Sequence, residues 1–431
     1  MIARLDGEVV VPGDPAYDEL RSTFVHAGRP ALIVRCRSPR DVAAALGHAR
    51  TEGLAVSVRG GGHHAAGFAT NDGGLVIDLS YLDGVEVVDP VRRLVRIGGG
   101  ATWGPVSKAL AGYGLALTSG DTADVGVGGL LLGGGIGWLA RRYGLALDSL
   151  VAAEVVTADG KPVRASDTEH PDLFWALRGG GGNFGVVTAF ELVAKPITDV
   201  VFGTVDYPAD RAVEVLTHWG RRAPGAPEEL TTAVNLMPGG APVSLQVCHA
   251  GGELAAAETA LAPVRGPVPA LRDDLRPVPY PSVLADMPGL PPGYRFATRS
   301  AFVPRVTPVL VETLVAGAAA APALAVNLRA LGGAVARTAP DATAFAHRGH
   351  AALLTLVLLG DAAAVDTTGP MLDELWQRLT PFVAGAYGNF GSTDRPGDVA
   401  AIYPPSTYRR LATIKHRYDP ANVFRRNYNV A

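Results

Sequence analysis

Two adjacent histidines, His63 and His64, follow three consecutive glycines in the stretch VRGGGHHAAG, residues 58–67. A run of glycines carries no side chains, so a ligand can approach its backbone closely. The bare N–H groups of such a run form nests that bind phosphate oxygens. The stretch therefore predicts a loop that holds a phosphate-bearing ligand beside an imidazole. A metal half-site, or a pair of surface histidines, is the alternative.

Glycine is concentrated in three places, at 60–62, 120–137 and 179–185. One such cluster could be an ordinary tight turn, but three clusters, each joined to a predicted strand, favour a large cofactor enclosed by several loops. The segment GGGNFG at 180–185 fits the nicotinamide fingerprint G-x-G-x-x-G. It follows a predicted helix and precedes a predicted strand, which is the reverse of the order that the fingerprint needs. We therefore discard a nicotinamide site.

The elements that position these glycines alternate between strands and helices. Residues 27–56 predict a strand, a helix capped by Ser38 and a second strand. Thr102 is predicted to cap a further helix, and residues 150–166 predict a hairpin, because alternating runs flank the turn residues ADGK. Beyond Pro196, strands and helices continue with fewer glycine clusters, which predicts a second α+β domain with an antiparallel sheet.

The composition limits the classes of protein. The 431 residues are 48% hydrophobic and 18% charged, which is typical of a globular chain with two or three domains. A formal charge of −3 argues against a dedicated nucleic-acid binder. The glycine-rich apolar run is too short to span a bilayer, the N-terminus lacks a signal-like apolar core, and two cysteines cannot form a disulfide framework. We expect a cytoplasmic protein with no membrane and no nucleic-acid partner.

Several stretches together resemble a known family. They are SVRGGGHHAAGFATNDGGLVIDLSYL, DVGVGGLLLGGGIGWLARRYGLALDSL, HPDLFWALRGGGGNFGVV and the tail YRRLATIKHRYDPANVFRRNYNV. The chain resembles the berberine-bridge-enzyme-like FAD-linked oxidases, which have the vanillyl-alcohol-oxidase (PCMH) type of FAD-binding fold. The resemblance covers nearly the whole chain, and it is strongest over 27–196 and 386–431.

The resemblance implies an α+β fold with two domains. The FAD-binding domain is expected at 1–196, with its core at 27–196. A substrate-binding domain with an antiparallel sheet is expected at 197–385. The C-terminal segment, 386–431, is expected to return to the FAD-binding domain.

In that family, the histidine after R-x-G-G carries FAD covalently through a ring nitrogen, which implies His63 as the attachment residue here. A neutral imidazole is a competent nucleophile. Relatives with a second bond to FAD use a cysteine where this chain has Thr122, so a single covalent link is expected. Val125 matches a position that controls access of oxygen to the flavin, where valine is typical of oxidases.

Further contacts with FAD are implied at residues that match the family's binding motifs. They are Arg59, Gly60, Gly61, Gly62, His64, Gly67, Gly120, Thr122, Val125, Gly126, Gly128, Gly129, Gly133, Gly135, Gly137, Val187, Asn427, Tyr428 and Asn429.

Tyr387, in the stretch YGNF, matches the tyrosine that often serves as the base in the family. A free tyrosine has a pKa of about 10, so we expect nearby cations, with Arg395 and Lys415 as candidates, or a hydrogen-bonded partner to lower the pKa of Tyr387. A structural, hydrogen-bonded tyrosine is the alternative. His347 is a candidate for the substrate pocket, and the alternative is a hydrogen-bonded histidine of the sheet. His347 and His350 have no carboxylate partner in register, so no metal site is predicted.

The function predicted from the residues and the resemblance is that of an FAD-dependent oxidase. It would transfer a hydride from an alcohol, a sugar or a secondary metabolite to covalently bound FAD and then to O2. Its partners would be a small-molecule substrate and O2. Two alternatives stay open: a flavin-binding cyclase of secondary metabolism in which FAD is mainly structural, and a protein that sequesters flavin.

Overall fold

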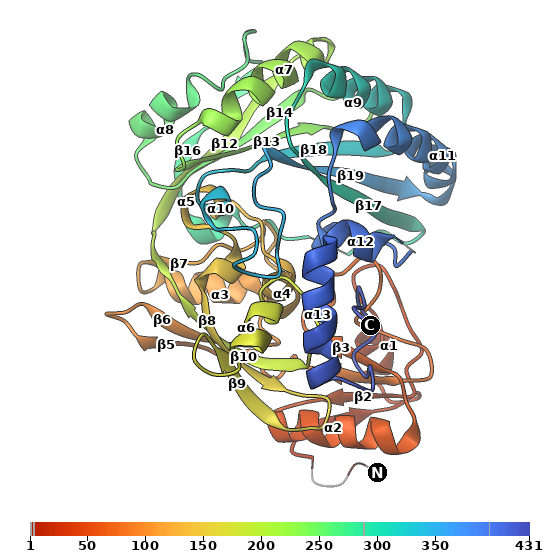
Figure 1. The fold of residues 1–431 in the computed structure, drawn as a ribbon. Coiled ribbons are helices and arrows are strands. Elements are labelled where there is room, and N and C mark those ends of the chain that lie inside the picture. Colours follow the sequence, from red (N-terminus) through yellow and green to blue (C-terminus); the bar gives the residue numbers. More distant parts are fainter. Residues whose placement is uncertain (1, 3–4, 288, 396) are drawn as a thin grey trace.

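The computed structural model describes residue 2 and residues 5–287, 289–395 and 397–431. Figure 1 shows two parts. The lower part contains the first strands and helices together with the C-terminal segment, and the upper part is a broad sheet with helices on its outer side. Helices and antiparallel sheets therefore coexist as separate layers, and the predicted α+β fold is confirmed.

A four-stranded sheet and a five-stranded sheet form the lower part. The first has the order β1-β2-β4-β3, in which β2, β4 and β3 run parallel. The second has the order β5-β6-β10-β8-β9 and is antiparallel, and its β8–β9 pair is the predicted hairpin. The strands are β1 (Glu8–Val10), β2 (Leu32–Arg35), β3 (Val56–Arg59), β4 (Leu75–Asp78), β5 (Val85–Asp89), β6 (Leu94–Gly98), β8 (Leu150–Val156), β9 (Pro162–Ser166) and β10 (Val186–Val193).

Ser38 and Thr102 are both predicted to cap a helix, and the structure shows a side-chain cap at Ser38 but not at Thr102. α2 (Pro39–Glu52) begins after Ser38, whose hydroxyl accepts from the backbone N–H of Asp41 while the Asp41 carboxylate accepts from the backbone N–H of Ser38. This reciprocal pair is a capping box, and the prediction is confirmed. The Thr102 side chain makes no capping hydrogen bond, so that prediction is wrong. The backbone N–H of Trp103, the first residue of the helix, donates to the carbonyl of Val125 instead.

The glycine-dense stretch 120–137 is not entirely loop, because it contains a short helix, α4. Two of its glycines, Gly134 and Gly135, have positive φ angles and turn the chain away from the end of that helix. The helices of the lower part are α1 (Tyr17–Leu20), α2, α3 (Trp103–Ala111), α4 (Val127–Gly133), α5 (Ala140–Tyr143) and α6 (Pro171–Leu177).

The upper part is built on a large antiparallel sheet with the order β15-β12-β14-β13-β18-β19-β17, and β16 also pairs with β12. All of its strand pairs are antiparallel, as predicted. The strands are β12 (Asp199–Tyr207), β13 (Leu230–Leu236), β14 (Val243–His249), β15 (Arg272–Asp273), β16 (Arg276–Pro279), β17 (Tyr294–Val303), β18 (Leu324–Ala330) and β19 (Ala352–Asp361).

The two faces of this sheet have different neighbours, because alternate residues of a strand point to opposite sides. Leu230 and Val234 of β13 belong to the hydrophobic core of the upper part. Figure 1 shows the helices that cover this face, α7 (Ala212–Arg222), α9 (Pro308–Ala320) and α11 (Ala362–Leu379). Ala233, on the opposite face of β13, packs into the core of the lower part. The inner face of the large sheet therefore covers the lower part, and we call this inner face the roof.

The segment after residue 386 lies against the lower part. The buried Nζ of Lys415 donates to the Asp419 carboxylate at 2.7 Å and to the carbonyls of Asn183 and Phe424 at 2.8 Å. These contacts fix the chain end beside the third glycine cluster. The helices of this segment are α12 (Asp398–Ile402) and α13 (Pro405–Tyr418).

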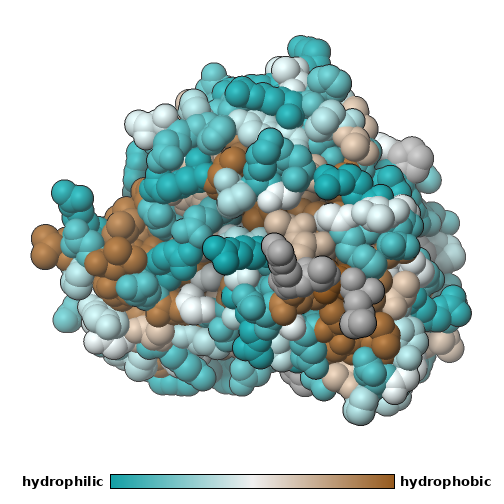
Figure 2. Space-filling view, turned by 90° about the horizontal axis from the view of Figure 1, so that it is seen from below, coloured by the Kyte–Doolittle hydropathy of each residue, from teal (hydrophilic) through white to brown (hydrophobic). Residues whose placement is uncertain are grey.

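Within the described residues, no helix is both long and apolar enough to cross a membrane. Figure 2 shows the molecule from below, where hydrophilic residues cover most of the face and hydrophobic residues gather in separate patches.

Candidate functional site

A cavity of about 1030 Å³ opens between the inner face of the large sheet and the glycine loops of the lower part. Pockets that hold one small molecule have volumes of about 300–1000 Å³. All three glycine clusters, the sheet and the segment after residue 386 contribute to its lining. The cavity therefore has room for a large cofactor together with a substrate.

Most of the residues predicted to form the site line this cavity. They are Gly60, Gly61, Gly62, His63, His64, Gly120, Thr122, Val125, Gly126, Gly128, Gly129, Gly133, Val187, Tyr387, Asn427 and Tyr428.

Six of the predicted site residues lie outside the lining: Arg59, Gly67, Gly135, Gly137, His347 and Asn429. Arg59 borders a neighbouring pocket of about 380 Å³, and its guanidinium pairs with the Asp78 carboxylate at 3.0 Å. Gly67 has a φ of +72° at a turn of the loop, and a Cβ at Gly137 would collide with the carbonyl of Ser119. These two glycines therefore shape the loops without forming the cavity surface.

Two glycine loops touch each other through their backbones at the edge of the cavity. A Cβ at Gly61 would lie 2.3 Å from the backbone nitrogen of Gly126, and a Cβ at Gly126 would lie 2.3 Å from that of Gly61. Real Cβ atoms do not come so close to a backbone atom, so glycine is required at both positions. The first and second glycine clusters therefore lie side by side because neither carries a side chain there.

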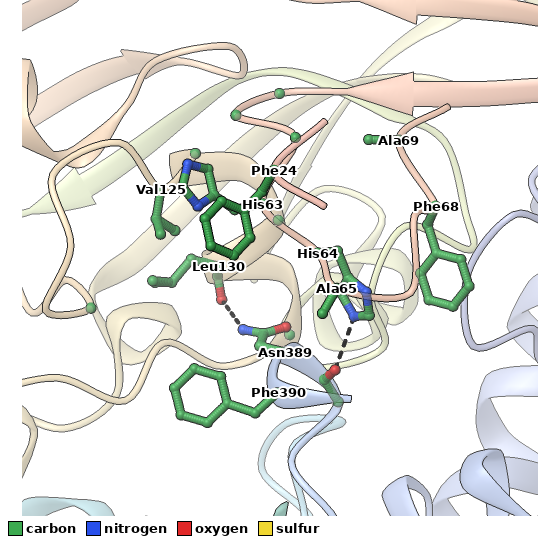
Figure 3. Close-up of a pocket in the computed structure, with 18 of the residues that line it drawn as sticks. Phe24, His63, His64, Ala65, Phe68, Ala69, Val125, Leu130, Asn389 and Phe390 are labelled. Atoms are coloured by element: carbon green, nitrogen blue, oxygen red, sulfur yellow. Dashed lines mark hydrogen bonds between the residues drawn. The ribbon is translucent and has the colours of Figure 1, made fainter. Parts of the chain in front are cut away.

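Both ring nitrogens of His64 are occupied. Its Nε2 lies 3.0 Å from the carbonyl oxygen of Gly388, and its Nδ1 accepts from the backbone N–H of Ala66 at 3.2 Å. Because Nδ1 accepts, Nε2 carries the proton and donates to Gly388. Figure 3 shows this contact from the loop to the distant segment. His64 therefore connects the first glycine cluster to the C-terminal segment and has no nitrogen left for a ligand.

The His63 ring lines the cavity and makes no hydrogen bond among the described residues. It stacks on Phe24, with ring centroids 5.1 Å apart and planes at 12°. Burial lowers the pKa of His63, and the nearby Asp124 carboxylate only partly opposes this change. The imidazole is therefore neutral at neutral pH, the form in which a ring nitrogen is nucleophilic.

Thr122, the position at which the family resemblance implies a cysteine in doubly linked relatives, is buried and lines the cavity. The two cysteines of the chain, Cys36 and Cys248, are free, buried and outside the lining. Burial raises the pKa of the Cys248 thiol to about 12 and also raises the pKa of Cys36. A thiol is nucleophilic only as the thiolate, so neither cysteine is suited to bond a ligand in this cavity.

Val125 also lines the cavity, and Figure 3 shows it grouped with His63 and Phe24, apart from His64 and Phe68. Its backbone carbonyl is fixed by the N–H of Trp103 at 3.0 Å. The side chain is therefore held on a rigid loop at the side of the pocket where the unoccupied imidazole lies.

The hydroxyl of Tyr387 is surrounded by donors. It accepts from the backbone N–H groups of Gly135 at 2.9 Å and Ile136 at 3.2 Å, and from the side-chain amide of Asn389 at 2.9 Å. The backbone of Tyr387 is tied to the large sheet, because Ser300 exchanges hydrogen bonds with its N–H and carbonyl groups. Tyr387 is therefore held from both sides of the cavity.

Hydrogen-bond donors and one cation lower the pKa of Tyr387, but neither Arg395 nor Lys415 is that cation. Burial raises the pKa of Tyr387, and the hydrogen bonds from Gly135, Ile136 and Asn389 only partly counteract burial. Lys415 is already paired with Asp419 and two carbonyls, and Arg395 is exposed. The cation that does act on Tyr387 is Arg329 of β18, a weaker influence that lowers the pKa.

His347 does not reach the cavity. Its ring stacks on Phe302, with centroids 4.7 Å apart, and its Nε2 lies 3.0 Å from the carbonyl oxygen of Ile402. The structure therefore favours the alternative, a hydrogen-bonded histidine packed against the sheet, and the substrate contact of His347 stays a prediction. Among the described residues, no group of three or more His, Cys, Asp or Glu side chains could hold a metal ion.

Six polar residues of the sheet that line the cavity were not predicted from the sequence. They are Asn235, Gln246, Thr298, Asn327, Arg329 and Thr355, from β13, β14, β17, β18 and β19. Arg329 pairs with Asp121 of the second glycine cluster at 2.5 Å and lies over the Trp138 ring at 4.5 Å. The alternation of each strand could have indicated which residues share a face, but not that these five strands are neighbours.

The cavity fits FAD in its chemistry. Three loops offer bare backbone N–H groups, which suit a pyrophosphate. Asn427 lines the cavity, and its buried Oδ1 has no hydrogen-bond partner among the described residues, so a donor from a ligand would satisfy it. The residues that would hold the cofactor are therefore the three glycine clusters, His63 and Asn427.

Comparisons with known proteins agree with this chemistry. Residues 30–166 match the model of a family described as "FAD binding domain", and residues 386–431 match one described as "Berberine and berberine like". The chain is 33% identical to (R)-6-hydroxynicotine oxidase of Paenarthrobacter nicotinovorans, over 99% of this chain and 97% of that protein.

Solved structures of similar proteins have the same fold. The crystal structure of 6-hydroxy-D-nicotine oxidase from Arthrobacter nicotinovorans has a TM-score of 0.89 at 31% identity and covers 99% of this chain and 98% of its own. A glucooligosaccharide oxidase from Acremonium strictum, described with 6-S-cysteinyl, 8α-N1-histidyl FAD, has a TM-score of 0.87 at 26% identity. It covers 99% of this chain and 97% of its own.

Proposed function

The chain belongs to the berberine-bridge-enzyme-like family of FAD-linked oxidoreductases, and we propose that it is an oxidase that holds FAD through one covalent bond at His63. The observation that carries the proposal is the contrast between the two histidines. Both nitrogens of His64 are occupied, whereas the neutral ring of His63 is unoccupied at the cavity. Thr122 in place of cysteine supports a single bond.

The substrate is a small organic molecule, and O2 is the oxidant. FAD, when bound, accepts a hydride and passes electrons to O2. The curated relatives include oxidases named for hydroxynicotine and for glucooligosaccharides, which favours an oxidase over the cyclase alternative. An alcohol, a sugar or a secondary metabolite is the substrate class that we propose for this chain.

The residues of the chain bind the substrate, exclude water and accept its proton. Residues 197–385 supply the sheet that covers the substrate, and residues 1–196 with 386–431 supply the loops that hold FAD. The sheet and the loops close the cavity against bulk water, which strengthens each polar contact inside. We expect the protein to be cytoplasmic, which cell fractionation would test.

Tyr387 is our candidate for the base that takes the proton from the substrate as the hydride leaves. Three N–H donors aim at its oxygen, an arrangement that stabilises a phenolate. Burial opposes ionisation and keeps the pKa above the ordinary value. Only the deprotonated tyrosine can accept a proton, so the rate of flavin reduction should rise with pH up to the raised pKa.

Covalent attachment is tested with His63→Ala and His64→Ala. Wild-type protein precipitated with acid should stay yellow, and a flavin-bearing peptide should contain His63. His63→Ala should bind FAD through the loops but release it on acid precipitation. His64→Ala, the matched control, should keep its flavin in the pellet. A yellow pellet from His63→Ala, or a colourless one from loaded wild-type protein, would contradict the proposal.

The oxidase activity is tested under anaerobic conditions. A substrate should bleach the flavin absorbance in the absence of oxygen, and admission of air should restore it. A flavin that no alcohol, sugar or aromatic metabolite bleaches would favour the sequestering alternative.

A further inference from the structure

Polar side chains form a row across the roof of the cavity. In the register of the sheet, Asn235 of β13 lies opposite Asn327 of β18, which lies opposite Thr355 of β19. The Asn327 amide donates to Asn235 at 2.7 Å, and the Asn235 amide donates to Gln246 of β14 at 3.0 Å. Cross-strand neighbours on one face lie about 5 Å apart, so these residues form one continuous polar strip.

The row leads to the candidate base. Thr355 lies opposite Ser300 of β17 in the register. The Ser300 hydroxyl donates to the carbonyl of Tyr387 at 3.0 Å and accepts from its N–H group at 3.2 Å. A polar group bound beside Thr355 therefore lies next to the strand that holds Tyr387.

One member of the row has an unsatisfied hydroxyl. Thr355 is 6% exposed, lines the cavity, and its buried Oγ1 has no hydrogen-bond partner among the described residues. A buried hydroxyl without a partner costs free energy that a ligand with a polar group removes. Thr355 is therefore the position in the row that is prepared for a substrate atom.

The roof carries no unpaired charge. Among the described residues that the sheet contributes to the lining, Arg329 is the one charged side chain, and Asp121 neutralises it at 2.5 Å. An ammonium group under this roof would lose its hydration without gaining a free carboxylate. The roof therefore disfavours a cationic substrate.

The other end of the roof is apolar. Tyr294 of β17 and Leu359 of β19 line the cavity and are 46% and 43% exposed, so they lie where it opens to solvent. Between them and the buried Thr355, Phe296 and Val357 lie on the same face of the sheet. Thr298 lies opposite Val357 there, but its hydroxyl already donates to the carbonyl of Phe390 at 2.6 Å. The roof therefore changes from apolar at the mouth to polar in the interior.

We infer that the substrate is a neutral, amphipathic molecule that places a hydroxyl or carbonyl group against Thr355 and Asn327 and its apolar body along Phe296, Val357 and Leu359. The inference rests on the proposed oxidase function and specifies the substrate class of the same site. An oligosaccharide, which carries hydroxyl groups along its whole length, would leave many of them against the apolar mouth. An organic cation would find no unpaired carboxylate among the described residues of the roof.

Three ligands of matched size and one disaccharide test this inference: 1-indanol, its hydrocarbon indane, the isosteric cation 1-aminoindane, and cellobiose. Calorimetry on FAD-loaded protein, without oxygen and at pH 7, gives their dissociation constants. We expect 1-indanol to bind at least about tenfold more tightly than each of the others, because they lack the hydroxyl, add a charge or lack the apolar body. Equal affinity for 1-aminoindane or cellobiose, or no binding of 1-indanol, would overturn the inference.

Thr355→Val is the matched variant, because valine keeps the shape and removes the hydroxyl. Since Oγ1 bonds to no described residue, the midpoint of thermal unfolding should not fall, while the affinity for 1-indanol should fall about five- to tenfold. Thr231→Val is the control, since Thr231 of β13 also has a buried hydroxyl without a partner among the described residues but lies outside the cavity lining. Unchanged affinity in Thr355→Val, or an equal loss in Thr231→Val, would contradict the role of Thr355.

The proposed oxidase function and the proposed substrate class can be contradicted independently of each other. Flavin content, and reoxidation of the chemically reduced protein by O2 at a rate faster than that of free reduced flavin, test the oxidase function without any substrate. Normal results there, with the wrong order of ligand affinities, would overturn only the substrate class.

Discussion

The glycine loops and the large sheet face each other across the same cavity, but they contribute to it in different ways. The loops offer backbone, and at Gly61 and Gly126 even a methyl group would collide with the opposite backbone. The sheet offers side chains, which change from apolar at the mouth to amide and hydroxyl groups in the interior. A backbone surface suits a cofactor that must always be bound in one way, whereas a side-chain surface can change its specificity without changing the fold.

The largest effect is expected at Tyr387, where the two surfaces meet. Its hydroxyl is bonded to the glycine loop and its backbone to β17. Tyr387→Phe should keep the packing and lower the rate of flavin reduction about 10²–10⁴-fold, because the proton acceptor is lost. The rise of that rate with pH should disappear in the variant, because the group whose raised pKa causes it is absent.

Rapid-mixing kinetics of the two half-reactions measures this effect. Reoxidation by O2 and flavin content should stay unchanged in Tyr387→Phe. A variant that reduces its flavin within a few-fold of wild type would mean that the proton goes elsewhere, with Tyr428 of the same cavity as the next residue to test.

A smaller effect is expected where the loops touch. Gly61→Ala would place its Cβ 2.3 Å from a backbone nitrogen that cannot move freely. Such overpacking lowers the free energy of unfolding by about 1–3 kcal/mol, and flavin content should fall with it. Denaturant unfolding measures the change.

Gly47→Ala is the control, because Gly47 lies inside α2, where an added Cβ would meet no atom within 4 Å beyond the backbone of the helix and its chain neighbours. Alanine should stabilise that helix by up to about 1 kcal/mol. Equal stability of the two variants would remove the argument that the loops need glycine to approach each other.

The smallest effect is expected at Val125, one of the few side chains that the glycine loops present to the cavity. Val125→Ile adds one methylene in the pocket beside His63 (Figure 3). One methylene in an apolar site changes a rate by about tenfold or more, so reoxidation by O2 should slow by about tenfold while reduction by substrate stays unchanged. Equal reoxidation rates would count against a role for Val125 in oxygen access.

The two surfaces also differ in how far the sequence predicts them. The loops are encoded by neighbouring residues, so the stretch RGGGHH alone predicts both the cradle and the imidazole beside it. The choice between His63 and His64 rested on the family resemblance. His64 is occupied because its ring bonds to the carbonyl of Gly388, a contact that no local sequence pattern contains.

The roof depends on long-range pairing and could not be predicted in the same way. Asn235, Asn327 and Thr355 look like isolated polar residues in apolar strands, and only the register of the sheet places them side by side. The packing of His347 could not be predicted for the same reason, because its stacking partner Phe302 lies on a strand distant in sequence. Arg395 and Lys415 do not act on Tyr387, because nearness in the sequence of the tail does not mean nearness in space.

The hydrogen bond from His64 to the carbonyl of Gly388 has a consequence for how the protein folds during its synthesis. The two residues are 324 positions apart, so the attachment loop is fastened only after the ribosome has synthesised at least that much further chain. Until then, the glycines next to His63 have been synthesised, but the segment that carries Tyr387 has not. Covalent loading of the flavin is thus expected to follow completion of the fold, so that a coloured molecule is also a correctly assembled one.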